Sequence, residues 1–197
     1  MDIDRINPPN IIKESSRGFG TVRMVDEMLS RREINLVGAI DEEVANSVCL
    51  QLRYLHAVDK SAPITIFINS GGGELASGLA IYDTMRAVGC PIRTVCMGMA
   101  ASMAALLFAA GGQRDMLPHS RVMVHDPLIQ SGAGGSSLAL KATAERLMRM
   151  REITTEILSR HTGKGVEELY EVTASDTYFE AEEAVEFGLA DRVIETF

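Results

Sequence analysis

The sequence predicts an α/β fold made of repeated βαβ units in one domain. Short runs rich in β-branched residues alternate along the chain with longer segments whose apolar residues recur at helical spacing. Such alternation is typical of a mostly parallel sheet joined by right-handed crossovers. The chain has 197 residues, 46% apolar and 23% charged, which suits one well-packed domain rather than a disordered chain.

The first half of the chain supplies three predicted strands, each followed by a predicted helix. The segment 41–58 begins with acidic residues, which suits the N-terminus of a helix. The predicted strands are 33–40, 63–70 and 91–98, and the predicted helices are 41–58, 74–88 and one that begins near Ser102 after a short GMAA turn.

The second half supplies the longest helical pattern, at roughly 138–160, with Gly163 as its expected C-cap. A glycine- and serine-rich loop, 128–137, precedes it. The remaining predicted elements are a strand at 120–127, short helices at 166–172 and 181–188, and a last strand at 190–196. Residues 1–20 are expected to be a mobile arm.

Composition excludes several functions. The formal net charge is −8 and no basic stretch offsets it, so no nucleic-acid partner is expected. Cys49, Cys90 and Cys96 form no CxxC pair and no zinc-ligand spacing, which favours buried thiols in a reducing compartment. The acidic, proline-containing start lacks the pattern of an export signal, so we expect a cytoplasmic protein.

The most apolar segment does not predict a membrane span. From Val95 to Ala110 there are 16 uncharged residues, fewer than the roughly 18–20 that a spanning helix needs. The segment also holds Gly98 and many alanines, which lower its hydrophobicity. We therefore expect a buried helix and no membrane partner.

Ser102 is the one hydroxyl in that segment, and it has two interpretations. It lies between a predicted strand and a predicted helix, so it could simply be the N-cap of the helix. The same junction resembles a nucleophile elbow, in which the N–H of the next residue, Met103, would help to hold an oxyanion. A nucleophilic serine would need a base.

His125 is the best candidate for that base, although a structural role stays open. It ends a predicted strand, and active sites in parallel sheets gather beyond the carboxyl ends of strands. Asp126 should point to the opposite face, so the third group must come from elsewhere among 27 acidic residues. His56, His119 and His161 are expected to be surface or cap residues.

The segment 69–78, NSGGGELASG, follows a strand and opens a helix. It matches neither a Walker loop nor G-x-G-x-x-G. It could be a tight turn, or a backbone that approaches a ligand and binds an oxyanion.

Together these segments resemble one family. FINSGGG, GLAIYDTM, CMGMAASMAALLFAAG, LPHSRVMVHDP, HTG and EAEEAVEFGLADRVI are similar, in order, to signature segments of ClpP, the proteolytic subunits of ATP-dependent Clp proteases. The resemblance covers about 11–196 and implies a ClpP/crotonase-like fold with a protruding handle helix. It implies an axial arm at 1–20 and one peptidase domain at 21–197, with the handle at about 126–162.

The resemblance also assigns roles to individual residues. It implies a catalytic triad of Ser102, His125 and Asp176. It implies that the oxyanion hole is formed by Gly73 and Met103, and that substrate is bound by Gly72, Gly134 and Gly135.

The implied activity is that of a serine endopeptidase without a cofactor. The family encloses its sites in two stacked seven-subunit rings and receives unfolded protein substrates from an AAA+ unfoldase such as ClpX, ClpA or ClpC. The partner would handle ATP, which agrees with the missing nucleotide motif. A homo-oligomer is expected, and a mixed ring with a second ClpP-type subunit is an alternative.

The chain departs from the family pattern at four places. Gly71 replaces a proline, Thr65 replaces an aromatic residue of the unfoldase-docking pocket, and Ala174-Ser175 replaces an Asp-Arg pair. The loop after His125 is about two residues longer and contains Gly132. These departures favour one alternative, a ring-forming paralogue with low or partner-dependent activity. A crotonase-type acyl-CoA enzyme is a second alternative.

Overall fold

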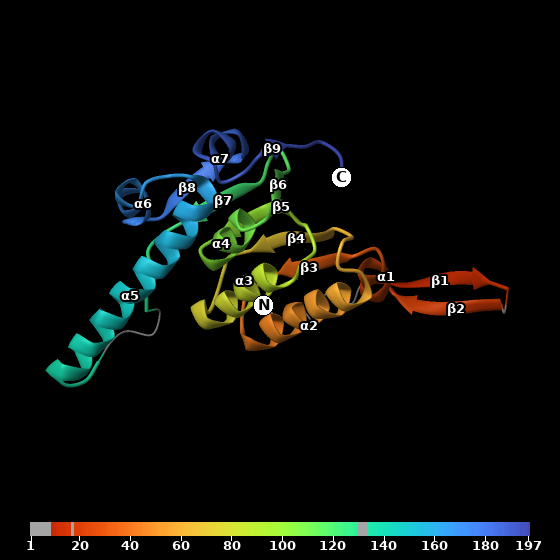
Figure 1. Ribbon diagram of the computed structural model, residues 1–197, viewed down its shortest axis with the longest axis horizontal. Coiled ribbons are helices and arrows are strands. Elements are labelled where there is room, and N and C mark those ends of the chain that lie inside the picture. Colours follow the sequence, from red (N-terminus) through yellow and green to blue (C-terminus); the bar gives the residue numbers. More distant parts are fainter. Residues whose placement is uncertain (1–8, 17, 130–133) are drawn as a thin grey trace.

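The computed structural model describes residues 9–16, 18–129 and 134–197, and it confirms an α/β fold (Figure 1). The strands are β1 Asn10–Ser15, β2 Gly18–Arg23, β3 Glu33–Val37, β4 Ile64–Ser70, β5 Ile92–Ala101, β6 Gln113–Met116, β7 Arg121–Val124, β8 Thr177–Glu180 and β9 Arg192–Val193. The helices are α1 Met24–Ser30, α2 Glu42–Val58, α3 Leu75–Ala87, α4 Met103–Ala109, α5 Ser137–Thr162, α6 Val166–Thr173 and α7 Ala181–Phe187.

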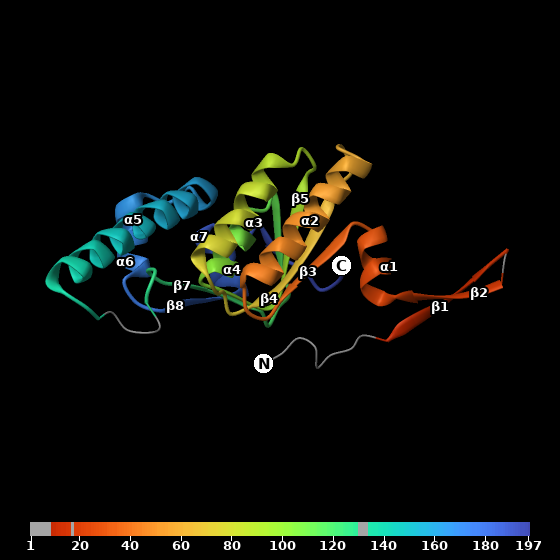
Figure 2. The ribbon, with the colours of Figure 1, turned by 90° about the horizontal axis from the view of Figure 1, so that it is seen from below.

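The main sheet is parallel except at one pair. Its order is β3-β4-β5-β6-β9, and β7 pairs in parallel with β5 and antiparallel with β8. Helices α2, α3 and α4 lie along one face of this sheet (Figure 2). Because β4, β5 and β7 are paired in parallel, their carboxyl ends lie close together. Active-site side chains gather at this edge in such sheets.

The core lies between the sheet and the helices that cover it, and it is formed by the buried apolar side chains of both. In β4 the side chains of Ile64, Ile66 and Ile68 are buried. They belong to the same cluster as the buried face of α2, which includes Val48 and Leu52. As predicted, α2 begins after an acidic residue, Asp41, whose carboxylate accepts the Val44 N–H at 2.9 Å.

The predicted GMAA turn is wrong, because β5 continues through it to Ala101. At Gly98 the backbone has φ 137°, and the side chain of Asn69 lies close enough to accept the Met99 N–H at 3.3 Å. Before this irregularity β5 pairs with β6, and after it β5 pairs with β7. After the change of partner, β5 stays paired with β7 up to Ala101, the residue before Ser102.

Further elements are found where none was predicted. Strands β1 and β2 pair antiparallel as a hairpin, which lies largely in the segment 1–20 that was expected to be a mobile arm. Residues 1–8 and 17 of that segment lie outside the described residues. The short elements α1, β6 and β8 were also not predicted.

Helix α5 projects from the body at one end of the molecule, and the hairpin projects at the other (Figure 1). The predicted C-cap is confirmed, since Gly163 adopts φ 75° and donates its N–H to Ser159 O at 2.9 Å. Several apolar side chains of α5 face solvent, among them Leu138 at 76% exposure and Met148 at 53%. No helix within the described ranges is long and apolar enough to cross a membrane.

Candidate active site

Ser102 lies at a sharp junction between β5 and α4. Its backbone has φ 54° and ψ −122°, a conformation that costs a residue with a side chain about 1–3 kcal/mol. Its N–H donates to Met123 O at 2.8 Å in the neighbouring strand β7, which helps to hold the junction. The hydroxyl does not cap α4, so the N-cap interpretation explains the position of the residue but not its side chain.

The hydroxyl instead meets His125. Ser102 Oγ and His125 Nε2 lie 2.8 Å apart, within hydrogen-bond distance. His125 follows the last residue of β7, and β7 is paired with the end of β5. Parallel pairing thus places the two residues side by side at the carboxyl ends of adjacent strands.

Asp176 lies on the other side of the imidazole. It directly precedes β8, whose Thr177 is paired with Val124 in the antiparallel β7–β8 ladder. Asp176 Oδ1 is 3.5 Å from His125 Nδ1, a long contact, and its side chain is 58% exposed whereas that of His125 is 14% exposed. The Asp176 carboxylate is therefore near His125 but remains solvated.

As expected, Asp126 turns away from its neighbour His125. Its N–H donates to Thr173 O at 2.7 Å, and its carboxylate accepts the Thr173 hydroxyl at 2.6 Å. Arg151 Nε of α5 lies 2.7 Å from the same carboxylate. This Asp126–Thr173–Arg151 cluster, which sequence reasoning missed, ties the chain after the histidine to both α5 and α6.

The glycine turn approaches Ser102 closely. Gly72 adopts φ 89°, and a Cβ on it would lie 2.7 Å from Ala101 O and 2.8 Å from Ser102 Cβ. Neither Gly73 nor Met103 has an acceptor for its backbone N–H among the described residues. The positive φ and this contact with the Ser102 junction both account for the glycine at 72, and the approach of the segment to a ligand stays a prediction.

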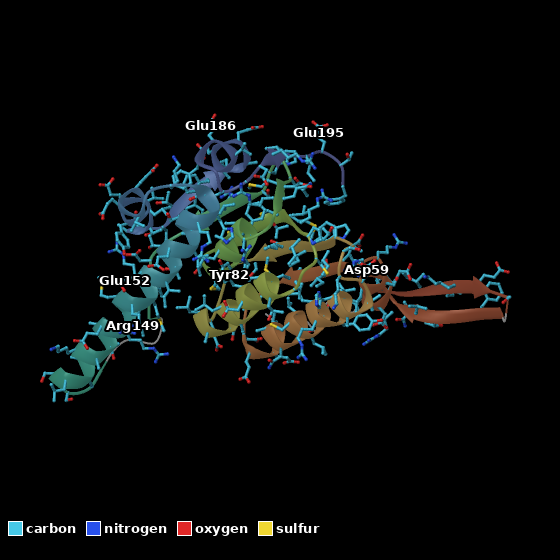
Figure 3. All side chains as sticks on the ribbon, in the orientation of Figure 1. Asp59, Tyr82, Arg149, Glu152, Glu186 and Glu195 are labelled. Atoms are coloured by element: carbon cyan, nitrogen blue, oxygen red, sulfur yellow. The ribbon has the colours of Figure 1, made fainter. Side chains whose placement is uncertain are left out.

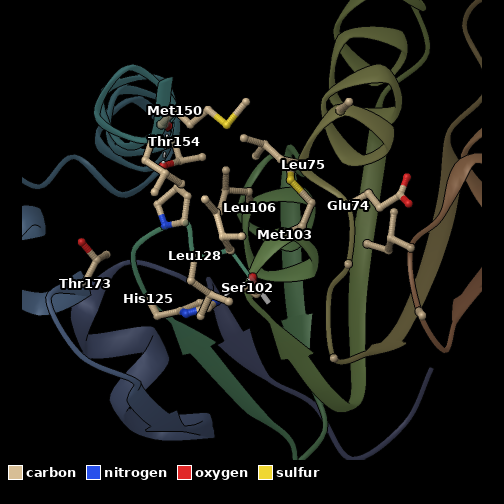
Figure 4. A pocket seen from close by; sticks show the side chains of 18 of the residues that line it. Glu74, Leu75, Ser102, Met103, Leu106, His125, Leu128, Met150, Thr154 and Thr173 are labelled. Atoms are coloured by element: carbon tan, nitrogen blue, oxygen red, sulfur yellow. Dashed lines mark hydrogen bonds between the residues drawn. The ribbon is translucent and has the colours of Figure 1, made fainter. Parts of the chain in front are cut away.

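A cleft of about 860 Å³ opens over Ser102 and His125. Figure 4 shows Leu75 and Met103 on one side of it, with Met150 and Thr154 of α5 on the other. Its lining is mostly apolar, which suits a binding site that holds apolar side chains beside a few polar groups.

None of the three expected substrate-binding glycines, Gly72, Gly134 and Gly135, is among the residues that line this cleft. Gly135 adopts φ 128° just before α5, and a Cβ on Gly134 would meet nothing within 4 Å. Their expected role stays a prediction. Gly132 lies outside the described residues.

The other histidines and the cysteines lie away from the cleft. His161 corrects one expectation, because it is half-buried and its Nε2 is 3.1 Å from Tyr82 Oη. Burial, with nearby guanidinium groups, lowers the pKa of His161 to about 4. Burial raises the pKa of the Cys96 thiol to about 11, which agrees with an inert thiol.

The chain is also similar to a known protein family. A family model described as Clp protease matches residues 16–197. Within the described ranges no group of three or more His, Cys, Asp or Glu side chains could hold a metal ion.

Proposed function

The chain belongs to the Clp protease family, and from this premise we propose that it is a serine endopeptidase subunit that cleaves unfolded polypeptides. Membership implies a peptidase that works within an oligomeric protease complex. The observation that carries the serine mechanism is the 2.8 Å contact of Ser102 Oγ with His125 Nε2 at a strained strand–helix junction.

The proposed reaction is acyl transfer. His125 Nε2 takes the proton of Ser102 as its oxygen attacks a peptide carbonyl, and the imidazole then protonates the leaving amine. Water releases the acyl group in a second, equivalent step. Asp176 would hold the imidazole proton on Nδ1, and the free N–H groups of Gly73 and Met103 would stabilise the oxyanion.

The remaining expectations complete the proposal. We place residues 21–197 in one peptidase domain and residues 1–20 in an arm at the axial pore. Two stacked heptameric rings would enclose the sites in the cytoplasm, and an AAA+ unfoldase would supply substrate. An enclosed chamber suits a peptidase that binds mainly apolar side chains and would otherwise cut many proteins.

A fluorophosphonate probe tests this proposal on the pure, assembled protein. We expect labelling of wild type and loss of labelling in Ser102→Ala. Ser47→Ala, at an exposed position of α2, is the matched control and should label normally. Absence of labelling on the assembled wild type would contradict a peptidase that is active by itself.

A second candidate is partner-dependent activity, and the geometry of Asp176 favours it. A carboxylate 3.5 Å from Nδ1 and 58% exposed holds the imidazole weakly. Adding a second ClpP-type subunit should then raise peptide hydrolysis by the Ser102 site. Mass photometry of the mixture would show whether mixed rings form, and an unchanged rate in mixed rings would argue against this candidate.

A further inference from the structure

One face of α5 borders the cleft, and a single charged side chain lies on that face. The α5 residues that line the cleft are spaced three or four apart or adjacent, as expected of one helical face. They are Thr143, Arg146, Leu147, Met150, Thr154 and Leu158. Arg146 is therefore the only cation that α5 presents to whatever occupies the cleft.

The charge of Arg146 is not used within the described part of the chain. Arg146 is exposed and makes no ion pair with any residue that the structure describes. On the opposite rim, the two acidic residues have partners of their own. Asp41 caps α2 through the Val44 N–H at 2.9 Å, and Glu74 accepts the Ser77 hydroxyl at 3.0 Å at the start of α3.

The cleft thus has a positive rim at α5 and a negative rim at the starts of α2 and α3. Both carboxylates also lie at helix N-termini, where the helix dipole partly offsets their charge. The guanidinium of Arg146 has no such compensation. It is the charged group of the lining most available to a bound molecule.

The position of Arg146 sets where it would meet a substrate. It lies eight residues before Thr154, which is about 12 Å along a helix at 1.5 Å per residue. An extended peptide advances about 3.3 Å per residue. For an extended peptide that runs along α5, a side chain at Arg146 would be about three to four residues from one at Thr154.

We propose that Arg146 is a specificity-determining residue that favours substrate segments with Asp or Glu at the position beside this part of α5. The inference rests on the proposed function, because it assigns a preference to the same cleft. The apolar lining would hold neighbouring side chains, and Arg146 would pair with the carboxylate. A Lys at the same substrate position would be disfavoured by like charge.

The same helix offers a matched control. Arg149 is also exposed on α5, but it lines a separate shallow hollow with Lys141, Glu145 and Glu152 rather than the cleft. Figure 3 labels Arg149 and Glu152 along α5. Arg149→Glu makes the same charge change as Arg146→Glu about one turn away, at a residue that does not line the cleft.

The experiment uses the assembled full chain and pairs of fluorogenic peptides that differ only in Glu or Lys at one position. The position is moved through both sides of the cleavage site. At one or two adjacent positions, we expect wild type to prefer Glu by about two- to fivefold in kcat/KM, the range of a solvated ion pair. We expect Arg146→Glu to reverse the preference, Arg146→Gln to remove it, and Arg149→Glu to keep it.

A binding measurement separates this inference from the proposed function. Fluorescence anisotropy of the same peptides on Ser102→Ala reports the charge preference without turnover. If wild type cleaves nothing but Ser102→Ala prefers Glu peptides through Arg146, the proposed function fails and the preference stands. An equal affinity for Glu and Lys peptides, or a preference that Arg149→Glu abolishes equally, overturns the inference.

Discussion

Replacing Gly72 with alanine should disable the candidate site without dismantling the fold. The added Cβ would lie 2.7 Å from Ala101 O, 2.8 Å from Ser102 Cβ and 3.1 Å from Met103 N. Two of these three atoms belong to backbone that leads into or out of the strained junction. The substitution therefore acts on the place where the nucleophile and one oxyanion donor are held.

The magnitude follows from two effects. Alanine at φ 89° is strained by about 1–2 kcal/mol. The contacts below 3.0 Å must also open, which moves Ser102 or the glycine turn by a few tenths of an ångström or more. Because a misplacement of about 1 Å can lower a rate about 10²-fold, we expect a loss of about 10- to 10²-fold in kcat/KM.

The assay is hydrolysis of a fluorogenic peptide, together with the rate of fluorophosphonate labelling of Ser102. Gly71→Ala is the matched control, since a Cβ there meets nothing within 4 Å and the φ of Gly71 is not positive. Gly71 also lines the cleft, but it is exposed and an added methyl group would strain no contact, so that variant should keep its rate within about twofold. Circular dichroism and mass photometry establish that both variants fold and assemble.

Two outcomes would refute this reasoning. One is a folded, assembled Gly72→Ala variant whose kcat/KM stays within threefold of wild type. The other is an equal loss in Gly71→Ala, which would mean that the turn is sensitive at every position rather than at its contact with Ser102.

The remaining predictions concern three other residues. Asp176→Asn should lower kcat for peptide hydrolysis by about 10- to 10²-fold. This is less than the loss of about 10⁴-fold for a buried triad aspartate, because the Asp176 carboxylate is solvated. A loss of about 10⁴-fold would contradict this prediction. Gly78→Ala places a Cβ against the Met103 side chain and should slow peptide hydrolysis about tenfold. Adding Met103→Ala should restore most of the rate, because it removes the atoms that the new Cβ meets. A double variant no faster than Gly78→Ala would refute this coupling between the two residues. Since the pKa of His161 is lowered to about 4, the unfolded chain binds this proton more readily, and stability should fall as pH drops from about 6.5 towards 4. His161→Gln should flatten the change in Tm between pH 7 and pH 4.5, and an unchanged slope would refute this assignment.

The periodicity of apolar residues predicted most of the sheet and its covering helices. It failed at β6, Gln113–Met116, because this strand holds the buried Asp115. Arg93 and Arg192 make ion pairs with that carboxylate from the neighbouring strands β5 and β9. These ion pairs, which compensate the buried charge, form only when the strands pair. The sequence around Asp115 alone therefore resembles a polar loop.

The hairpin of β1 and β2 was missed for a different reason. Its side chains are largely exposed, including Ile12 and Phe19, so no alternation of buried and exposed positions marks either strand. The pairing is antiparallel and local, and it lies outside the main sheet. A pattern method that depends on burial has nothing to detect there.

The candidate site divides in the same way. Ser102 and His125 were selected from their positions at the ends of predicted strands, and the structure places their side chains in contact. Asp176 could not be chosen from the residues alone, because its place beside His125 depends on the antiparallel β7–β8 pairing. Only the family resemblance indicated it.

The exposed apolar side chains of α5 should affect how fast the unassembled chain is degraded. Leu138 and Met148 face water in the single chain, at 76% and 53% exposure. Such surface is what molecular chaperones bind and quality-control proteases select. An unassembled copy of the chain should therefore be cleared faster than an assembled one.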